Sequence, residues 1–537
     1  MMAVNIADLF EHAVDLMPER VAVACGEREA TYAQLEERAN KLAHHLAQHG
    51  VQAGSHVGVC ARNSIEFVET MIAVFKLRAV VINVNYRYVE NELRYLFENS
   101  DLVALVHDRQ HADRVATIRP DVPKLKHVVV IDDGAAQAGT PTDDVDFETA
   151  IAGTESARDF GERSPDDLYI LYTGGTTGYP KGVMWRHEDI WRVLGGGVDF
   201  MTGEPLPDEF AQAQKGKQFG PLVRLCAAPL IHGNAQWAAL AALFAGDKVV
   251  FVPQFDPHDV WRAVEKHQVN VLVIVGDAMA RPLIEAYQEE GYTVEKLYAV
   301  SSSAALFSPS LKEQYLATFP NTLLTDAIGS SETGFAGIGI ITKDTEQTSA
   351  GPRVKPGPKT IVIDEHDRPI EPGSGQVGRL ARGGHVPLGY YKDEEKTKRL
   401  YAEVAGERHT VPGDLATIEA DGTIIMLGRG NTCVNTGGEK VFPEEVEGAL
   451  KAHPDVFDAL VIGLPDERLG QSVVAVVQPR PGAALEAAAL DAHMHSQLAG
   501  YKAPRTIWVA DEIGRTVSGK ADYRWAKAYA ENNEPLG

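Results

Sequence analysis

Apolar residues recur at two different spacings along the chain. They repeat at intervals of three and four positions over residues 6–17, 31–49 and 64–76, and each of these stretches predicts a helix with one buried face. Residues 21–25 instead form a short, continuous apolar run, which is typical of a buried strand. The N-terminal region is therefore expected to alternate helices with strands.

Further short apolar runs occur at 57–60, 80–84, 103–106 and 128–131, and helical patterns lie between them. Such alternation predicts a parallel α/β sheet. A helix is expected over 185–194, whereas residues 201–224 are polar and interrupted by prolines, which predicts a long surface loop. Strands are then expected again at five places, which are 227–230, 249–251, 271–275, 298–301 and 322–327. The fold class is therefore α/β.

The pattern changes near Ile361, where short strands are joined by turns rich in aspartate, glycine and proline. A small β-rich subdomain is expected to end near residue 428. A helix at 443–452, strands at 458–463 and 473–478, and a helix from Leu485 then predict a compact α+β domain at the C-terminus. The large N-terminal region thus combines parallel α/β sheets with a β-rich subdomain.

Charge and composition narrow the possible partners. The net charge of -24 opposes general attraction to nucleic acid or to anionic membranes, so an anionic ligand needs a local site. The four cysteines are far apart, which indicates neither a disulfide framework nor a zinc site. No basic leader and no apolar stretch of membrane-spanning length is found. We expect a cytoplasmic protein without a transmembrane segment, and a homo-oligomer is compatible with the sequence.

Residues 173–182 read Thr-Gly-Gly-Thr-Thr-Gly-Tyr-Pro-Lys-Gly and directly follow an apolar run. Glycines bring backbone N–H groups close to an anion, threonine hydroxyls add donors, and lysine adds positive charge. The pattern predicts a phosphate-binding loop. The residues expected to contact the phosphate are Thr173, Gly174, Gly175, Thr176, Thr177, Gly178 and Lys181. A surface hairpin without a ligand fits the composition about equally well. A P-loop NTPase is set aside because Lys181 is followed by Gly182 and not by serine or threonine.

Several downstream motifs change that balance. They are Gly-Ser-Ser-Glu-Thr at 329–333, Pro-Gly-Asp at 412–414, Gly-Arg at 428–429, Gly-Gly-Glu-Lys-Val-Phe-Pro at 437–443 and Arg-Thr-Val-Ser-Gly-Lys at 515–520. Together with the glycine-rich loop they resemble the adenylate-forming superfamily, which includes acyl-CoA synthetases, firefly luciferase and the adenylation domains of nonribosomal peptide synthetases. The resemblance covers nearly the whole chain. It implies a nucleotide- and acyl-binding domain over 1–430 and a mobile small domain over 431–537, which moves about a hinge near 431–432.

The resemblance also assigns roles around the nucleotide. Glu332 is implied as the ligand of Mg²⁺ and Ser331 as the hydroxyl directed at phosphate, with Gly329 and Ser330 also in the nucleotide-binding segment. Gly-Ser-Ser-Glu alone would suggest a helix N-cap. Ser303, Ala304, Ala305 and Asp326 are implied to lie near the base. Two positions depart from the family pattern, because Gly174 stands where serine is usual and Ile328 where an aromatic residue is usual.

In the remaining motifs, Asp414 is implied to bind the ribose hydroxyls and Arg429 to contact the nucleotide. Gly437, Gly438 and Glu439 are implied to line the path of the CoA pantetheine arm. Lys520 is implied to enter the site for adenylation and to balance negative charge there, although a lone exposed lysine would otherwise be a surface residue. His232 is implied to gate the acyl pocket, and a buried structural histidine fits it nearly as well. The hinge carries Asn431 and Thr432 where an acidic residue or lysine is usual.

The function implied by the resemblance is an AMP-forming acyl-CoA synthetase that uses ATP, Mg²⁺ and coenzyme A. Its catalytic residues are expected to be Lys520, Glu332, Thr173, Lys181 and His232. Residues 276–283 and 301–310 resemble an actinobacterial group that acts on long-chain fatty acids and steroid side-chain acids, so a hydrophobic acid is expected. Two alternatives stay open, namely an acyl-AMP ligase that serves a carrier protein and an inactive nucleotide-binding relative.

Overall fold

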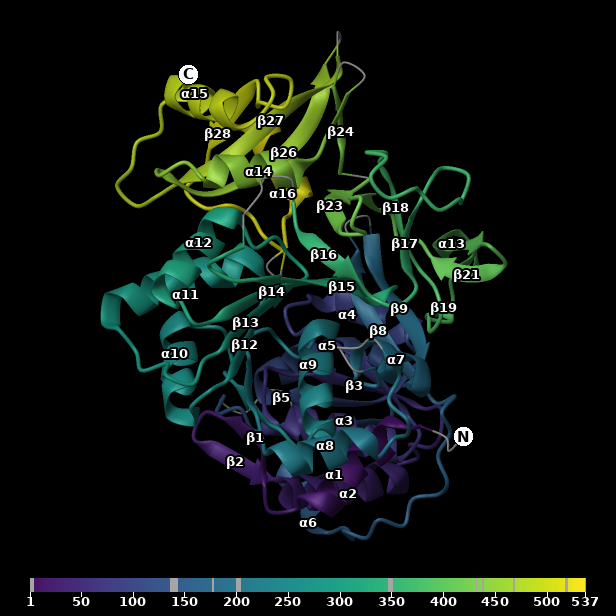
Figure 1. Cartoon of the computed structure of the whole chain (residues 1–537). Helices are drawn as coiled ribbons and strands as arrows, with labels where there is room; N and C mark the ends of the chain where they lie inside the picture. The colour runs from purple at the N-terminus through teal and green to yellow at the C-terminus, as the bar shows by residue number, and fades with distance from the viewer. Residues whose placement is uncertain are drawn as a thin grey trace. The chain divides into compact units, whose positions relative to one another are not determined.

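The computed structural model describes residues 4–135, 143–175, 178–198, 204–345, 351–430, 432–436, 439–466, 469–516 and 520–536. The chain folds into two compact units, and its ribbon is shown in Figure 1. The first unit contains Met1–Val273, Glu290–Leu297 and His385–Leu400. The second unit contains Ile274–Glu289, Tyr298–Gly384 and Tyr401–Gly537. Among the described residues, no helix has the length and apolar character needed to cross a membrane.

One sheet of the first unit has the strand order β19-β9-β8-β4-β3-β5-β6-β7. Neighbouring strands from β8 through β4, β3, β5 and β6 to β7 run parallel, whereas β9 is antiparallel to β8 and β19 to β9. The central strands are buried apolar runs, as expected for a sheet covered on both faces. The strands are β3 (His56–Cys60), β4 (Val80–Asn83), β5 (Leu102–Asp108), β6 (His127–Ile131), β7 (Val145–Asp146), β8 (Leu168–Gly175), β9 (Gly178–Arg186) and β19 (Gly389–Tyr390).

The long N-terminal helices of the first unit begin at strong capping residues. Thr31 and Gln34 form a capping box at the start of α2 (Tyr32–Gln48), and Ser64 caps α3 (Ile65–Lys76). The predicted opening helix is α1 (Ile6–Leu16), so all three N-terminal helices are confirmed. The remaining helices here are α4 (Glu90–Asn99), α5 (Ala112–Ile118), α6 (Phe147–Ala152), α7 (His187–Leu194), α8 (Ala211–Phe219), α9 (Gly233–Phe244), α10 (Pro257–His267) and α13 (Glu394–Leu400).

A second group of strands in the first unit has the order β2-β1-β11-β10-β12. Strands β1, β11, β10 and β12 are parallel, and β2 pairs with β1 as an antiparallel edge strand. The bounds are β1 (Val21–Cys25), β2 (Arg28–Thr31), β10 (Val223–Cys226), β11 (Lys248–Phe251) and β12 (Val271–Ile274). The predicted parallel α/β class is therefore confirmed.

Three local predictions in the first unit are wrong. The predicted surface loop at 201–224 contains helix α8, whose alanine-, glutamine- and lysine-rich sequence favours a helix, and it runs into strand β10. The strand expected at 227–230 is β10, which lies four residues earlier at Val223–Cys226, because the apolar run continues past the end of this strand. The helix expected from Trp185 begins at His187, since Trp185 still pairs with Tyr169 in the hairpin of β8 and β9.

The second unit combines helices α11 (Gly276–Glu290) and α12 (Pro309–Thr318) with a largely antiparallel sheet. Its strand order is β13-β14-β15-β16-β23-β22-β18-β21-β20, and β17 pairs with β18. The predicted β-rich region from Ile361 to residue 428 contributes six of these strands. The bounds are β13 (Ala299–Ser303), β14 (Leu323–Ser330), β15 (Gly334–Ile341), β16 (Arg353–Pro356), β17 (Thr360–Ile363), β18 (Gly378–Arg382), β20 (Tyr401–Val404), β21 (Glu407–Thr410), β22 (Asp414–Ile418) and β23 (Ile424–Arg429).

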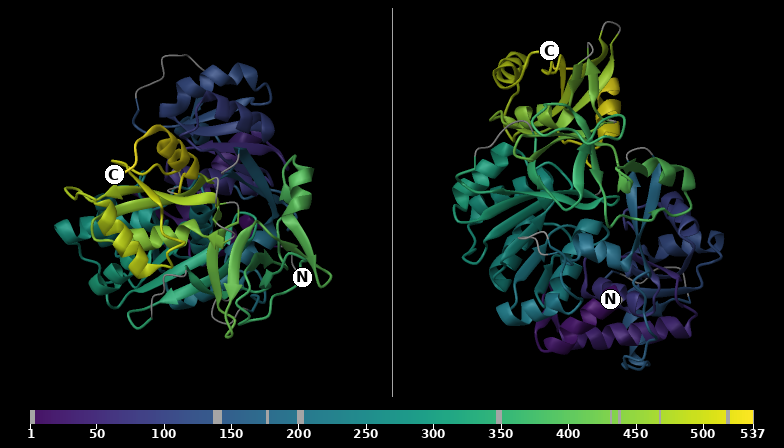
Figure 2. Two further views of the ribbon diagram at one scale, coloured as in Figure 1. Left: turned by 90° about the horizontal axis from the view of Figure 1, so that it is seen from above. Right: turned by 45° about the vertical axis from the view of Figure 1, so that its right-hand side comes forward.

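The C-terminal part of the second unit has its own sheet, β25-β24-β27-β26, with β28 parallel to β27. Figure 2 shows the long hairpin of β26 and β27 with its helices in two further views. The predicted α+β pattern after residue 443 is confirmed. The elements are β24 (Val434–Thr436), β25 (Glu439–Val441), α14 (Pro443–Lys451), β26 (Val456–Asp466), β27 (Gly470–Pro479), α15 (Ala487–Gln497), β28 (Thr506–Val509) and α16 (Tyr523–Asn532). The domain boundary at 430/431 stays a prediction, and Asn431 lies outside the described residues.

Helix α11 carries three charged contacts to the C-terminal part of the second unit. Asp277 forms an ion pair with Lys451 of α14 at 2.7 Å, and both side chains are buried. Although burial alone would raise the pKa of Asp277, Lys451 holds it below its ordinary value. Arg281 lies over the ring of Phe457, and Glu285 pairs with Arg480 near the surface.

Candidate functional site

The glycine-rich segment forms the hairpin between β8 and β9. Thr173 and Lys181 lie opposite each other in the antiparallel register, and Gly175 lies opposite Gly178. The structure therefore brings two of the predicted catalytic residues, Thr173 and Lys181, together near the turn of one hairpin. Thr176 and Thr177, which complete the predicted loop, lie outside the described residues.

Lys181 is held beside an aromatic face. Its ammonium nitrogen lies 5.3 Å from the ring centroid of Tyr390 in β19, the strand that pairs with β9. The carboxyl group of Asp393 has a lowered pKa, chiefly because Lys396 bonds to it and partly because of the charge of Lys181. The residue after Lys181 is a glycine, and a larger residue would not fit there, because a Cβ on Gly182 would lie only 2.8 Å from side-chain atoms of Ile170 and Tyr172. The hairpin thus presents a lysine whose surroundings are fixed by a third strand.

A buried side chain from β4 fixes the approach to this hairpin. The Asn83 amide nitrogen donates to the carbonyl of Tyr172 at 2.8 Å, and the Tyr172 N–H donates to the Asn83 carbonyl oxygen at 2.7 Å. The same amide nitrogen donates to the carbonyl of Ile231 at 2.7 Å. Sequence reasoning missed Asn83, and its only signal was a polar residue at the carboxyl end of an apolar strand.

His232 follows Ile231 and occupies the N-cap position of helix α9. The beginning of this helix packs against β8, because an added Cβ on Gly233 would overlap a methyl group of Leu171. Asn83 therefore links the segment that carries His232 to the residue that precedes Thr173.

In the second unit, two parallel strands carry the residues implied to lie near a base. Ser302 of β13 lies opposite Asp326 of β14, and Ser303 lies opposite Ala327. Strand β13 ends at Ser303, and Ala304 follows with a φ of 67°, which a residue with a side chain adopts only under constraint. Ser303, Ala304 and Ala305 thus form a sharp turn at the carboxyl end of β13, which is a common position for ligand contacts in α/β sheets.

The carboxylate of Asp326 has a buried partner. It forms an ion pair with Lys312 of α12, whose ammonium group also lies 5.7 Å from the ring centroid of Phe307. Burial raises the pKa of Asp326, and Lys312 opposes that rise. The side chain therefore fastens β14 to α12. Sequence reasoning did not identify Lys312, because its partner is 14 positions away and is reached only when the helix packs on the strand.

The motif at 329–333 is the tight turn that joins β14 to β15, so the alternative of a helix N-cap is wrong. The hydroxyl oxygen of Ser330 accepts hydrogen bonds from the N–H groups of Glu332 and Thr333, both at 3.2 Å. The Ser330 N–H donates to the hydroxyl of Thr333 at 2.9 Å. Gly329 is required because a Cβ there would overlap the carbonyl of Gly334. The turn holds the half-buried Glu332 carboxylate on a fixed backbone, a donor that suits a hard divalent cation.

Asp414 and Arg429 come from different motifs but lie opposite each other in the antiparallel pair of β22 and β23. The adjoining glycines are also joined, since the Gly430 N–H donates to the carbonyl of Gly413 at 2.9 Å. Gly428 has a φ of 99°, and a Cβ there would overlap the carboxylate of Glu444 at the start of α14. The ribose motif and the hinge motif are therefore one structural element.

Lys520 is exposed at the base of a narrow loop. The Thr516 N–H donates to the carbonyl of Lys520 at 2.8 Å, and the Lys520 N–H donates to the Thr516 hydroxyl at 3.2 Å. Arg515 anchors this loop to β26 through an ion pair with Asp458 at 2.6 Å. Residues 517–519 at the tip lie outside the described residues, as do Gly437 and Gly438, while Glu439 begins β25.

Two family models match this chain. The model of the AMP-binding enzyme matches residues 10–391, and the model of the AMP-binding enzyme C-terminal domain matches residues 445–520. The C-terminal match contains Lys520 and all but the first two residues of helix α14. The first match contains the hairpin of β8 and β9 and the turn at 329–333.

Individual relatives match over nearly the full length. A 3-oxocholest-4-en-26-oate–CoA ligase of Rhodococcus rhodochrous is 57% identical over 532 residues, which cover 98% of this chain and 96% of the relative. A medium/long-chain-fatty-acid–CoA/3-oxocholest-4-en-26-oate–CoA ligase of Mycobacterium tuberculosis strain H37Rv is 52% identical over 531 residues, covering 99% and 97%.

Among solved structures, ATP-bound MatB of Rhodopseudomonas palustris is similar with a TM-score of 0.80 and 25% identity, covering 98% of this chain and 99% of that one. The anthranilate CoA ligase AuaEII in complex with anthranoyl-AMP gives a TM-score of 0.85 at 21% identity, covering 97% and 96%. This second likeness shows the fold alone. Both agree with a large α/β region followed by a smaller C-terminal region.

Proposed function

Because this chain belongs to the AMP-binding enzyme family, we propose that it activates a hydrophobic carboxylic acid with ATP and transfers the acyl group to coenzyme A. The observation that carries the proposal is the 57% identity, over nearly the whole chain, to a steroid-acid CoA ligase. A second relative at 52% identity is named for both fatty and steroid acids. The substrate class is therefore a medium- or long-chain fatty acid or a steroid side-chain acid.

The reaction has two steps. In the first, a carboxylate oxygen of the acid attacks the α-phosphorus of ATP, and the bond to pyrophosphate breaks. In the second, the thiolate of coenzyme A attacks the acyl carbonyl of the adenylate, and the carbon–oxygen bond to AMP breaks. Both steps bring negatively charged groups together, so positive charge and N–H donors must be placed in advance.

The first unit supplies the phosphate grip. Lys181 and Thr173 are paired across the hairpin, so their ammonium and hydroxyl groups project from the same face of it and can both bind the phosphates that leave as pyrophosphate. Gly174, Gly175 and Gly178 leave the backbone open to the phosphates, and Thr176 and Thr177 add hydroxyls in the same loop. The hydrogen bonds from Asn83 to Tyr172 and to Ile231, which precedes His232, support a role for His232 in gating the acyl pocket.

The second unit supplies the remaining contacts. Glu332 suits a Mg²⁺ ion, because its carboxylate is carried on a turn whose backbone is fixed by Ser330, and Mg²⁺ would neutralise phosphate charge when bound. The hydroxyl of Ser331, which lies between Ser330 and Glu332 in the motif, is assigned to phosphate. Asp414 binds the ribose hydroxyls, with Arg429 opposite it on β23. The turn of Ser303, Ala304 and Ala305 borders the base.

Asp326 acts differently from the other residues of this group. Its carboxylate is committed to Lys312, so it supports the nucleotide by holding strand β14 in place rather than by direct contact. Gly329 and Ser330 act through the geometry of the turn that follows β14.

Lys520 serves only the first step in this proposal. Its ammonium group balances charge as the acid approaches the α-phosphate, and it is withdrawn when the 431–537 domain rotates about residues 431–432. Gly437, Gly438 and Glu439 then line the path of the pantetheine thiol. Lys520→Ala should slow formation of the adenylate and spare the conversion of preformed acyl-adenylate into acyl-CoA, while Lys527→Ala on the exposed face of α16 serves as a matched control.

The decisive experiment measures AMP, pyrophosphate and acyl-CoA together for a panel of saturated fatty acids, aromatic acids and steroid side-chain acids. We expect the three products in equal amounts with fatty or steroid acids, and only when ATP, Mg²⁺ and CoA are present. Accumulation of acyl-adenylate without a CoA thioester would identify an acyl-AMP ligase. Absence of ATP turnover with every acid would identify an inactive relative.

A further inference from the structure

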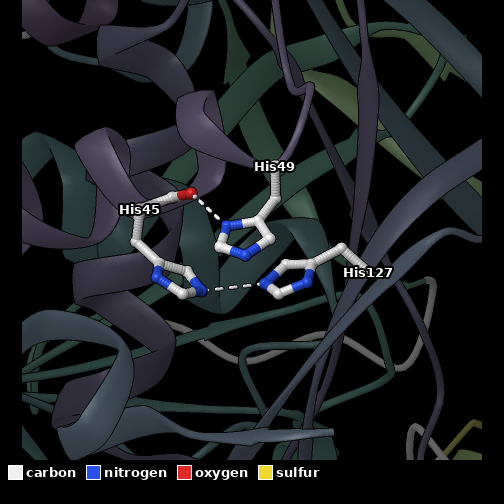
Figure 3. A group of neighbouring side chains, drawn as sticks. All are labelled: His45, His49 and His127. Atoms are coloured by element: carbon white, nitrogen blue, oxygen red, sulfur yellow. Dashed lines mark hydrogen bonds between the residues drawn. The ribbon is translucent and has the colours of Figure 1, made fainter. Parts of the chain in front are cut away.

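Three histidines gather at a place that the proposed reaction does not use (Figure 3). His45 lies in the last turn of α2, His49 directly follows this helix, and His127 is the first residue of β6. One ring nitrogen from each lies within 4.8 Å of the others. His45 and His127 are buried, whereas His49 is exposed.

The tautomer of His49 is fixed by the backbone. Its Nδ1 lies 2.8 Å from the carbonyl oxygen of His45, and a carbonyl only accepts hydrogen bonds, so Nδ1 carries the proton. In the neutral ring the electron pair then lies on the other nitrogen, Nε2. A ligand histidine whose second nitrogen donates to a backbone carbonyl is the usual arrangement around bound metals.

His45 and His127 face each other through their Nε2 atoms, 2.9 Å apart. One nitrogen must donate and the other accept, so a single proton is shared between two electron pairs. A dication in place of that proton would be coordinated by both nitrogens, with a separation of about 3.3 Å for bonds of about 2.0 Å. For His45 and His127 the adjustment from the present distance is a few tenths of an ångström. The ring of His49 is stacked on that of His127 at 4.0 Å, and its ligand atom lies within 4.8 Å of the other two, so this exposed side chain would turn toward the metal on binding.

The local charge is compatible with a cation. Burial and the neighbouring imidazoles lower the pKa of His45 and of His127 to about 4, so both rings are neutral at neutral pH. The nearby cation Arg119 is compensated by an ion pair with Asp144 at 2.6 Å. Neutral imidazole is the form that binds metals.

We propose that His45, His49 and His127 bind one transition-metal dication of the Zn²⁺ class, with solvent beside His49 supplying the fourth ligand. Imidazole nitrogens favour Zn²⁺, Co²⁺, Ni²⁺ or Cu²⁺ over Mg²⁺, which prefers oxygen. This metal is therefore distinct from the Mg²⁺ that accompanies ATP.

The position indicates a structural role. Strands β8, β4, β3, β5 and β6 are parallel, the glycine-rich hairpin follows the carboxyl end of β8, and His127 begins β6. The metal site therefore lies at the amino ends of the parallel strands, whereas the glycine-rich hairpin lies at their carboxyl ends. Strand β6 is also four strands away from β8, which is about 19 Å across the sheet. A metal there joins the end of α2 to β6 and stabilises the first unit without touching the reacting groups.

Metal binding can be tested directly on the full chain without a histidine tag, in buffer that contains excess Mg²⁺. We expect one equivalent of Co²⁺ to produce visible absorption bands of a low-symmetry site, and Zn²⁺ to displace it. Zn²⁺ should also raise the thermal midpoint by at least roughly 2 °C. His49→Ala should weaken binding at least about tenfold and abolish the thermal shift.

His44→Ala is the matched control, because His44 lies on the same helix and bonds instead to the carbonyl of Ala157 at 3.0 Å. This variant should bind Co²⁺ like the parent chain. Acyl-CoA synthesis should be unchanged in both variants, so the result does not depend on the proposed reaction. Equal Co²⁺ affinity in the parent and in His49→Ala, or no binding at micromolar Co²⁺, would show that the histidines form only a hydrogen-bonded cluster.

Discussion

The side-chain amide of Asn83 bonds to both backbone groups of Tyr172, at 2.7 and 2.8 Å. Asn83 is the last residue of β4, and Tyr172 lies in β8 one residue before Thr173. The amide thus replaces the strand-to-strand hydrogen bonds at the point where β4 ends and β8 continues. A side chain from one strand thereby helps to set the direction in which the hairpin of β8 and β9 leaves the sheet.

Replacing Asn83 tests this role. Asn83→Ala leaves the buried N–H and C=O of Tyr172 unpaired, which should lower the free energy of unfolding by about 1–3 kcal/mol. It should also raise the KM for ATP, because the hairpin is no longer held. Asn40→Ala removes another buried amide, bonded to Glu36 and to the Ser156 carbonyl, and should reduce stability without changing this KM. A KM shift of equal size in both variants would count against a specific role of Asn83.

The loop that carries Lys520 should depend on its anchor. Arg515→Gln breaks the ion pair with Asp458, and we expect adenylate formation to fall by up to about a hundredfold, because small displacements of a reacting group are costly. Conversion of preformed acyl-adenylate into acyl-CoA should be much less affected. Rapid-quench measurement of the two half-reactions distinguishes them, and an equal loss in both would mean that Arg515 only stabilises the fold.

Gly428 should tolerate no side chain. Gly428→Ala adds the strain of a φ of 99° to an overlap with the carboxylate of Glu444, and we expect it to destabilise the chain by more than the roughly 1–2 kcal/mol of left-handed strain alone. Gly482→Ala is matched, because Gly482 also has a positive φ, of 79°, but an added Cβ meets nothing within 4 Å. Urea unfolding of both variants gives their free energies of unfolding, and the difference between them measures the effect of the overlap with Glu444. Equal destabilisation would show that the Glu444 side chain moves aside.

Stability should fall in acid partly because of His187. Its buried Nδ1 accepts a hydrogen bond from the Ile6 N–H at 3.3 Å, and burial lowers the pKa of His187 to about 4 from 6.5. Between these two values the unfolded chain binds more protons than the folded chain, so stability decreases as the pH is lowered from 6.5 toward 4.

We expect His187→Gln to reduce this acid-induced loss by an amount of up to about 3 kcal/mol. Urea unfolding at pH 7.5, 6 and 5 measures it. The exposed His366 provides the control, since His366→Gln should keep the pH dependence of the parent chain. An unchanged pH dependence in His187→Gln would mean that other buried groups account for the acid sensitivity.

Removing one partner of the buried ion pair between Asp277 and Lys451 should strongly destabilise the fold. Lys451→Met leaves a buried carboxylate without its counter-charge, which should reduce the free energy of unfolding by about 3–5 kcal/mol. Adding Asp277→Asn should recover part of this loss, because the charge disappears and the bond from the Ser308 N–H can persist. Arg480→Met breaks a more exposed pair with Glu285 and should change stability by less than about 1 kcal/mol. A purely additive double variant would argue against coupling.

The sequence predicts most of the helices and parallel strands because local signals determine them. Helix α2 has its capping box and its periodic apolar face, and β3 and β4 are uninterrupted apolar runs. Helix α8 was missed because the prolines on either side of it outweighed its helix-forming composition. The ends of β9 and β10 were misplaced because a change in periodicity does not mark the residue at which pairing stops.

The candidate site divides in the same way. Thr173, Lys181 and Glu332 are recognisable in short motifs, since glycines and hydroxyls around a charged residue form a local pattern. Asn83 and Lys312 are not, because their partners are reached only through packing of distant segments. The importance of a buried polar residue of this kind emerges only when its partner is known.

The unequal burial of the two ion pairs on α11 has a consequence for ionic strength. Lys451 and Asp277 have side chains that are 2% and 6% exposed, whereas those of Arg480 and Glu285 are 32% and 39% exposed. Dissolved salt screens the exposed pair and hardly reaches the buried one. A rotation of residues 431–537 that separates Lys451 from Asp277 would therefore meet nearly the same electrostatic resistance in dilute buffer and in concentrated salt, and the balance between the two half-reactions would be insensitive to ionic strength.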